Sequence, residues 1–365
     1  MKKILIFSHE FPPRLGGAGG VALQLANYFI SLGHDVTVLT KKRQHSTVYD
    51  FKLIEIPIFW KLWFMSYFIF LKVHNIYQYD HIILNDAGAI YSSGLSLSSN
   101  QLEKSIVYIH GMEKYLAEKS IYLKILRFKK TYLKVMSKSS RIISVSNYIK
   151  NRFLKNDFAV FLKKTKTVYN GVDSKQFYYI NKNVYSKYNL PKKSIILLTV
   201  GRFVIEKGFL KKIEIFEELL KVNKNYVWFI IGDGSFKNKF NKIIKDKCLT
   251  KNIYLLGAKS KEELKYYYSD SNFFWLLSTF TQPKKYDWVE SFGLVYLEAM
   301  SCKCIPIAWN DKGPIEVIKN NVNGFLANSN EDVIEFLQSG YKKIDRDDLP
   351  NQVVEIENSY KMVLP

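Results

Sequence analysis

The sequence predicts an α/β protein with two doubly wound parallel sheets, one in each of two domains. Short runs rich in β-branched residues alternate with stretches of helical period over residues 4–169, and the alternation starts again at residue 195. A polar stretch without a clear period, residues 177–193, separates the two series. The length of 365 residues fits two domains. We therefore expect domains at residues 1–180 and 181–365.

Each expected strand is a short run of Ile, Val, Leu or Phe that ends at polar or turn-forming residues. The first series gives strands at 4–8, 35–40, 81–85, 106–110, 141–146 and 167–169 and an amphipathic helix at 21–32. The second gives strands at 195–200, 227–231, 253–256, 273–278 and 305–308 and a helix at 210–222. Ligands of doubly wound sheets bind beyond the carboxyl ends of the strands, so we expect the two domains to face a central cleft.

The charge balance limits the classes of binding partner that we expect. The chain has 54 Lys and Arg against 33 Asp and Glu, a formal net charge of +21. Residues 1–180 hold 26 basic and 11 acidic side chains, whereas residues 181–365 hold 28 and 22. The excess in the first domain favours a polyanionic partner, which is nucleic acid, an anionic membrane surface or a phosphorylated substrate.

Cysteine content and apolar runs predict a cytoplasmic protein. Three cysteines, an odd number, fit a reducing compartment better than a disulfide framework. The apolar start at residues 4–7 resembles a signal peptide, but His9, Glu10 and two prolines end it too early. The longest apolar stretch, residues 62–71, is about half as long as a bilayer span. We therefore expect neither export nor a transmembrane helix.

The most informative stretch is residues 290–306. Gly293 marks the turn from a loop into a helix, and an exposed helix start binds anions through its backbone N–H groups and dipole. Glu290 and Glu298 are eight residues apart, which is at most about 12 Å along a helix axis. We expect the two carboxylates to bracket a diphosphate held at the helix start.

This stretch resembles the E-x7-E signature of the retaining family 4 glycosyltransferases, whose GT-B fold has two Rossmann-like domains facing a cleft. Other segments follow the order of the same family across nearly the whole chain. They are residues 12–17, 33–38, 110–111, 145–146, 169–173, 200–208, 231–234 and 323–326. Each segment alone is a weak signal, whereas their common order is a strong one.

The resemblance implies a role for each candidate residue. Arg202 and Lys207 neutralise the donor diphosphate, a task that suits a guanidinium fork and an ammonium group. Glu298 accepts hydrogen bonds from the nucleotide ribose, Glu290 faces the donor sugar, and His110 contacts the sugar or stabilises charge near the anomeric carbon. The remaining donor-binding residues are Gly16 and Gly17, which let the backbone approach the diphosphate, Gly232, and Ser291, Phe292, Gly293 and Leu294 at the helix start.

Each role has a plainer structural alternative. In a chain of this charge, Glu298, Arg202 and Lys207 could be solvated surface residues. His110 could be a structural histidine at a strand end, and Gly232 could serve a turn only.

Two rival motifs carry less weight. Residues 17–22 satisfy the pattern G-x-G-x-x-A, but a proline-containing loop separates them from the first strand and no acid follows at the spacing that NAD binding requires. Asp345 and Asp347 match the metal-binding pattern D-x-D but lie in a polar tail. We expect no cofactor and no metal, because cations and a helix N-terminus can stabilise the leaving diphosphate.

Two features of the first domain concern the acceptor. Fifteen Lys and Arg lie between residues 114 and 166, and residues 58–71 are rich in aromatic side chains. Such features dock proteins on anionic lipid, although the aromatic stretch is somewhat more typical of a core helix. The loop at 279–289 is longer than is usual in the family, which favours its own contact with the sugar or acceptor. After residue 324 the chain is short for the helix that, in this family, packs back on the first domain. A C-terminal segment that packs back on the first domain stays an alternative to a second domain that keeps all of residues 181–365.

These features predict a retaining, metal-independent glycosyltransferase that moves a sugar from a nucleotide diphosphate donor, such as a UDP-sugar, to a hydroxyl acceptor. We expect a saccharide or lipid-linked saccharide acceptor in bacterial surface polysaccharide synthesis, for lipopolysaccharide or capsule, at the inner face of the cell membrane. The alternative is a sugar-nucleotide epimerase or phosphorylase on the same architecture. No nucleic acid partner is expected, because the sequence has no helix-turn-helix, RRM or zinc pattern.

Overall fold

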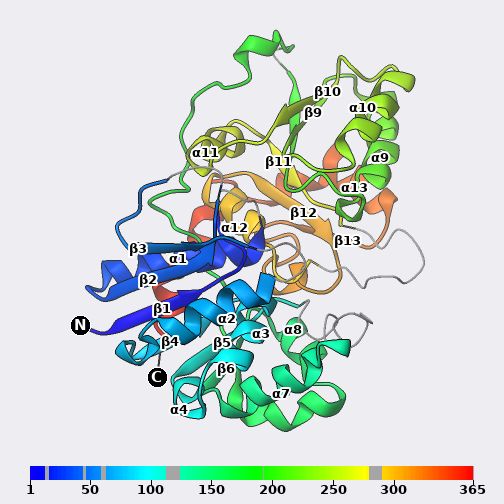
Figure 1. Cartoon of the computed structure of the whole chain (residues 1–365). Helices are drawn as coiled ribbons and strands as arrows, with labels where there is room; N and C mark the ends of the chain where they lie inside the picture. The colour runs from blue at the N-terminus through cyan, green and yellow to red at the C-terminus, as the bar shows by residue number, and fades with distance from the viewer. Residues whose placement is uncertain are drawn as a thin grey trace. The chain divides into compact units, whose positions relative to one another are not determined.

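The chain folds into two compact units, each built around its own sheet (Figure 1). The computed structural model describes residues 1–12, 16–43, 47–58, 63–111, 124–191, 193–278 and 290–364. Unit 1 comprises Met1–Asn170 and Ile356–Pro365, and unit 2 comprises Gly171–Glu355. The structure thus divides the chain before Gly171, whereas the sequence placed the boundary after residue 180, and it assigns the last residues to unit 1.

Unit 1 contains a seven-stranded parallel sheet in the order β3-β2-β1-β4-β5-β6-β7. Ile4 of the central strand β1 lies opposite Val36 of β2 and His81 of β4. The strands are β1 (Lys3–Phe7), β2 (Asp35–Lys41), β3 (Lys52–Ile56), β4 (His81–Leu84), β5 (Ser105–Ile109), β6 (Arg141–Ser144) and β7 (Thr165–Thr167). The winding reverses between β1 and β4, and ligands of such sheets bind beyond the strand ends at this point.

Helices pack on the sheet of unit 1, and every residue of β5 is buried, as expected for a parallel strand covered on both faces. The α-helices are α1 (Gly17–Ser31), α2 (Trp63–Val73), α3 (Ala87–Ser96), α4 (Ser99–Glu103), α7 (Phe128–Lys138), α8 (Asn147–Phe153) and α14 (Ile356–Tyr360), and the 3-10 helices are η2 (Ile76–Gln78) and η3 (Asn156–Lys164). Asp86 caps α3 by accepting a hydrogen bond from Ala89 N, and Ser146 caps α8 through Ile149 N.

The aromatic stretch forms helix α2, which has one buried and one exposed side. Phe64 and Tyr67 lie in the core of unit 1, whereas Met65 and Ile69 are exposed. Residues 59–62 of this stretch lie outside the described residues. Across the described ranges, the helices lack the combination of length and apolar content that crossing a membrane requires.

The C-terminal segment packs on α1 and β6 of unit 1. Tyr360 is buried, and its hydroxyl donates a hydrogen bond to Gln24 Oε1 of α1 at 2.9 Å. Arg141 Nη1, at the start of β6, donates to the carbonyl oxygen of Met362 at 2.7 Å. These contacts tie the end of the chain to the unit in which it begins.

Unit 2 contains a six-stranded parallel sheet in the order β10-β9-β8-β11-β12-β13. Its strands are β8 (Ile195–Val200), β9 (Tyr226–Ile231), β10 (Ile253–Gly257), β11 (Phe273–Trp275), β12 (Ile305–Trp309) and β13 (Phe325–Ala327). Its α-helices are α9 (Phe209–Val222), α10 (Lys237–Asp246), α11 (Lys261–Ser269), α12 (Leu294–Ser301) and α13 (Asn330–Gln338), and its 3-10 helices are η4 (Ser186–Tyr188), η5 (Ile205–Lys207), η6 (Pro314–Glu316), η7 (Gly340–Lys343) and η8 (Leu349–Gln352). The prediction of two doubly wound parallel sheets is confirmed.

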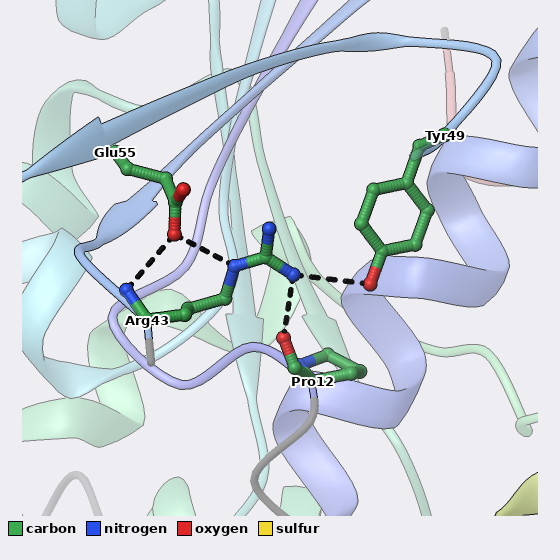
Figure 2. Close-up of polar contacts among 4 residues, drawn as sticks. All are labelled: Pro12, Arg43, Tyr49 and Glu55. Atoms are coloured by element: carbon green, nitrogen blue, oxygen red, sulfur yellow. Dashed lines mark hydrogen bonds and ion pairs between the residues drawn. The ribbon is translucent and has the colours of Figure 1, made fainter. Parts of the chain in front are cut away.

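A buried arginine holds the segment that follows β1 (Figure 2). Arg43 Nε donates to Glu55 Oε1 of β3 at 2.8 Å, and Nη1 donates to Pro12 O at 2.9 Å and to the Tyr49 hydroxyl at 3.2 Å. Desolvation raises the pKa of Glu55, but the hydrogen bonds and charge of Arg43 outweigh it, so that the pKa is lowered overall. A buried charge needs such partners. Because Arg43 bonds both Glu55 of β3 and the carbonyl oxygen of Pro12, it connects the segment of Pro12 to β2 and β3.

Candidate active site

In unit 2 the loops that follow β8 and β9 pack backbone against backbone. Gly232 has a φ of +144°, and a Cβ at this position would lie 1.8 Å from Gly201 O. A Cβ on Gly234 would lie 2.5 Å from Phe203 O. No side chain fits at either glycine, since each would meet backbone atoms. Gly232 therefore supports the loop that carries Arg202 and Lys207.

This loop places Lys207 against the first glutamate of the motif. Lys207 Nζ lies 2.6 Å from Glu290 Oε2, and both side chains are 18% exposed. Ser278 Oγ lies 3.5 Å from the same carboxylate oxygen. Partial burial makes this ion pair stronger than a fully solvated one. Arg202 lies in the same loop, directly after Gly201, and is exposed.

The second glutamate of the motif, Glu298, is buried in the middle of α12. Its side chain accepts a hydrogen bond from the Tyr268 hydroxyl at 3.1 Å, and the residue is 7% exposed. Burial raises the pKa of Glu298, although the charge of Lys261 and the Tyr268 hydrogen bond act in the opposite direction. Glu298 is thus not on a solvated helix face, and its partner differs from that of Glu290.

The residue before α12 has a left-handed backbone conformation, which glycine adopts easily. Gly293 has a φ of +98° and precedes the helix without a side-chain cap. Phe292, just before it, is buried, and Leu294 is the first residue of the helix. A Cβ on Gly313 would lie 2.3 Å from Glu290 O, so the loop after β12 backs the segment of Glu290 and Ser291. The loop after β12 therefore holds the segment that leads into α12 in place.

In unit 1 a polar network occupies the reversal point between β1 and β4. The Asp86 carboxylate accepts hydrogen bonds from Glu10 N and Ala89 N, both at 2.9 Å. Asn85 Nδ2 donates to Ser8 Oγ at 2.9 Å and to Ala18 O at 2.8 Å. These bonds join the ends of β1 and β4 to the first turns of α1 and α3.

His110 extends this network from the end of β5. Its Nε2 lies 3.3 Å from Asn85 Oδ1, so the tautomer with a proton on Nε2 donates to the amide oxygen. Burial lowers the pKa of His110 to about 4, against the opposing effects of the Asp86 charge and an Asn85 backbone hydrogen bond. The imidazole is therefore neutral at physiological pH.

The two predicted donor-binding glycines of unit 1 differ in their surroundings. A Cβ on Gly16 would lie 1.1 Å from Glu10 Oε1, so the Glu10 carboxylate occupies the space beside this glycine. A Cβ on Gly17, the first residue of α1, would meet no atom of the described residues within 4 Å. A side chain at Gly16 would therefore have to displace the flexible Glu10 carboxylate, whereas the space beside Gly17 is open to the described residues.

Some predicted features fall outside the described residues or elsewhere in the fold. Residues 13–15 of the glycine-rich segment, residues 112–123 of the basic run and the loop at 279–289 are not described. Asp347 of the D-x-D pattern pairs with Lys303 at 2.7 Å. Within the described ranges, no group of three or more His, Cys, Asp or Glu is placed to hold a metal ion.

Sequence reasoning missed four residues of these networks: Glu10, Asn85, Asp86 and Tyr268. Asn85 ends the predicted strand at 81–85 and Asp86 follows it, so the rule that sites lie beyond strand ends would have singled them out. Tyr268 has no such signal, because its contact with Glu298 depends on the packing of α11 against α12.

Comparison with known proteins assigns a class to this fold. Residues 15–176 match the family model described as Glycosyltransferase Family 4, and residues 181–355 match the model described as Glycosyl transferases group 1. Two Rossmann-like parallel-sheet units are the architecture of the GT-B glycosyltransferases. The chain consists of a glycosyltransferase family 4 domain followed by a glycosyl transferases group 1 domain.

Individual relatives are more distant. The chain is 28% identical over 243 residues to an uncharacterized glycosyltransferase of Methanocaldococcus jannaschii, a match that covers 67% of this chain and 58% of the relative. It is 28% identical over 173 residues to the alpha-monoglucosyldiacylglycerol synthase of Acholeplasma laidlawii, covering 46% of this chain and 41% of the synthase. The crystal structure of Anabaena Alr3699/HepE in complex with UDP and glucose superposes with a TM-score of 0.76 at 16% identity, covering 100% and 98% of the two chains.

The low pKa of His110 predicts a specific pH dependence of stability. The folded pKa of about 4 lies below the ordinary value of 6.5, so the unfolded chain binds more protons between these values. The unfolding free energy should fall as the pH drops from about 6.5 to 4, by on the order of 2 kcal/mol from this group. Denaturant unfolding of wild type and His110→Gln at several pH values measures it. Parallel pH profiles of the two proteins would contradict the assignment.

Proposed function

We propose that this protein is a retaining glycosyltransferase that transfers a sugar from a nucleotide diphosphate donor to a hydroxyl acceptor. The observation that carries the proposal is the ion pair of Lys207 and Glu290, held by the loops after β8 and before α12. It brings a cation suited to a diphosphate onto the carboxylate that, by resemblance, faces the donor sugar. Both residues lie in the domain that matches the Glycosyl transferases group 1 model.

The proposed chemistry requires charge stabilisation more than acid or base strength. The bond between the anomeric carbon and the diphosphate oxygen breaks, and the acceptor oxygen bonds to the same face of the sugar. The acceptor hydroxyl proton passes to a departing phosphate oxygen. Arg202 and Lys207 stabilise the charge that develops on the diphosphate, and neutral His110 contacts the sugar. This scheme uses no metal.

The remaining assignments follow from the same scheme. Glu298 receives the ribose hydroxyls. The segment 291–294, Gly16 and Gly17 contact the diphosphate or sugar through their backbone, and Gly232 shapes the loop beneath. A uridine nucleotide is the first candidate donor, because the HepE structure contains UDP and glucose.

An epimerase or phosphorylase on the same fold is the alternative. Such an enzyme would turn over the nucleotide sugar without an acceptor hydroxyl or with inorganic phosphate. A transferase lacking its acceptor should show only slow hydrolysis.

The acceptor side of the proposal is a saccharide or lipid-linked saccharide of a bacterial surface polysaccharide, reached at the inner face of the cell membrane. The Acholeplasma relative is named for a glycosylated diacylglycerol. In unit 1, η3 carries exposed Val160, Leu162 and Lys163, and the contacting helix α7 carries Lys129 and Lys130; we call these five residues the α7–η3 surface. Val160 is 77% and Leu162 is 58% exposed. Lys129 pairs with Asp157 of η3, which joins the two elements.

Donor binding is the first prediction of this proposal. A thermal-shift screen with UDP, GDP, ADP and dTDP should show stabilisation by at least one nucleotide. Lys207→Ala should lower the affinity for that nucleotide by about tenfold or more, since a charged hydrogen bond is worth about 1.5–3 kcal/mol. Glu298→Ala should lower the same affinity because the contact with the ribose is lost. Lys221→Ala, at the exposed far end of α9, is the matched control. Binding of no nucleotide, or wild-type affinity in Lys207→Ala, would refute the donor site.

Membrane association is a separate prediction. The protein should float with vesicles containing phosphatidylglycerol, remain behind with phosphatidylcholine alone, and be released by high salt, because each basic residue near an anionic surface contributes about 1 kcal/mol. The double variant Val160→Glu with Leu162→Glu should lose flotation. Val222→Glu, at an exposed apolar position of unit 2, should retain it. Equal flotation of the two variants would exclude the α7–η3 surface.

A further inference from the structure

Helix α9 contains a fully buried lysine that the proposed mechanism does not use. Lys212 Nζ donates a hydrogen bond to Thr199 Oγ1 at 3.2 Å and has no exposed surface. Three aromatic rings surround it, with centroids at 4.5 Å for Phe209, 5.4 Å for Trp228 and 5.9 Å for Trp275. Lysine is rarely buried without a paired acid, so this position demands an explanation.

The elements packed around Lys212 supply no counter-charge to it. Strands β8, β9 and β11 present Thr199, Trp228 and Trp275, which are uncharged. The charge that acts on the amine is that of another cation, Lys207. The acids nearby serve other lysines: Glu214 and Glu331 act on Lys211, Glu217 pairs with Lys247, and Glu218 pairs with Lys221. Within the described residues, no carboxylate forms an ion pair with Lys212.

This environment favours the neutral amine. An ammonium group has three N–H donors, and the hydrogen bonds of the described residues give Lys212 one acceptor, Thr199 Oγ1. The ring faces attract a cation, but that attraction is smaller than the cost of burying an unpaired charge. Burial, and then the charge of Lys207, lower the pKa of Lys212 well below its ordinary value.

Lys212 also lies at the base of the loop proposed to hold the diphosphate. Its partner Thr199 is three residues before Arg202, and Lys212 itself is five residues after Lys207. The amine therefore links the end of β8 to the first turns of α9, the two elements that the loop connects. A diphosphate carries more negative charge than the Glu290 carboxylate that pairs with Lys207 in the unliganded protein, so its binding offsets the repulsion that Lys207 exerts on Lys212.

We propose that Lys212 takes up a proton from solvent when a nucleoside diphosphate binds beside Lys207, so that donor binding is coupled to protonation of a buried amine. The inference rests on the proposed function, because it assumes that the diphosphate binds at this loop. It adds a proton-linked step to that site.

Calorimetric titration with UDP in two buffers of different ionisation enthalpy at one pH measures the coupling. Wild type should show net proton uptake, and its UDP affinity should fall as the pH rises, by at most about tenfold per pH unit for one proton. Lys212→Met keeps the chain length and suits the aromatic surroundings. It should bind UDP with less proton uptake and a flatter pH profile. Lys211→Met, the neighbouring lysine that faces Glu214, should behave as wild type.

A measurement on the wild type covers the case in which Lys212→Met does not fold. In protein labelled with carbon-13 at the lysine ε position, addition of UDP should move one lysine signal from the neutral to the charged chemical shift. Equal proton uptake in wild type and Lys212→Met, or no lysine signal that changes protonation, would overturn the inference while leaving UDP binding intact. If UDP, GDP, ADP and dTDP all fail to bind, the proposed function and this inference fall together.

Discussion

The contact between Lys207 and Glu290 is the constraint on which the carboxyl edge of the second sheet depends. It ties the loop after β8 to the segment before α12 at 2.6 Å. Glycines let neighbouring backbones support both partners: Gly232 lies beneath Gly201, and Gly313 lies against the backbone of Glu290. The ion pair is thus held by loops whose backbones lie so close together that no side chain fits at Gly232 or Gly313. Such a framework holds a charged site in place before any ligand arrives.

In both units, a carboxylate lies at the position that we propose to bind an anion. In unit 2 a carboxylate, Glu290, already neutralises Lys207, and in unit 1 the Glu10 carboxylate lies against Gly16. In unit 2, an anion that binds at Lys207 competes with Glu290, and in unit 1, an anion that binds beside Gly16 displaces or avoids the Glu10 carboxylate. Binding therefore exchanges one set of charge contacts for another, and its net free energy is smaller than the contacts of the bound state alone suggest.

The sequence predicted the fold class and most strands, because parallel strands covered on both faces are continuous apolar runs. It missed β3 (Lys52–Ile56), which contains two charged residues, and β13 (Phe325–Ala327), which is only three residues long; each is an outer strand of its sheet. Residues on the E-x7-E motif could be singled out because their spacing is local. The partners Tyr268 and Lys212 could not, since a tyrosine on α11 and a lysine on α9 become distinctive only when tertiary packing buries them. The burial of Glu298 was likewise a consequence of packing that helical period alone did not reveal.

The most direct test of this account compares UDP affinity in wild type and Glu290→Gln. UDP lacks the sugar that Glu290 is proposed to face, so the carboxylate acts on UDP binding only as a competitor for Lys207. Its removal should tighten UDP binding by about fivefold, equivalent to about 1 kcal/mol, while turnover of a UDP-sugar falls. Unchanged or weaker UDP binding in Glu290→Gln, measured by calorimetry at the same pH and salt, would contradict the claim that the ion pair is the diphosphate site in its unliganded form.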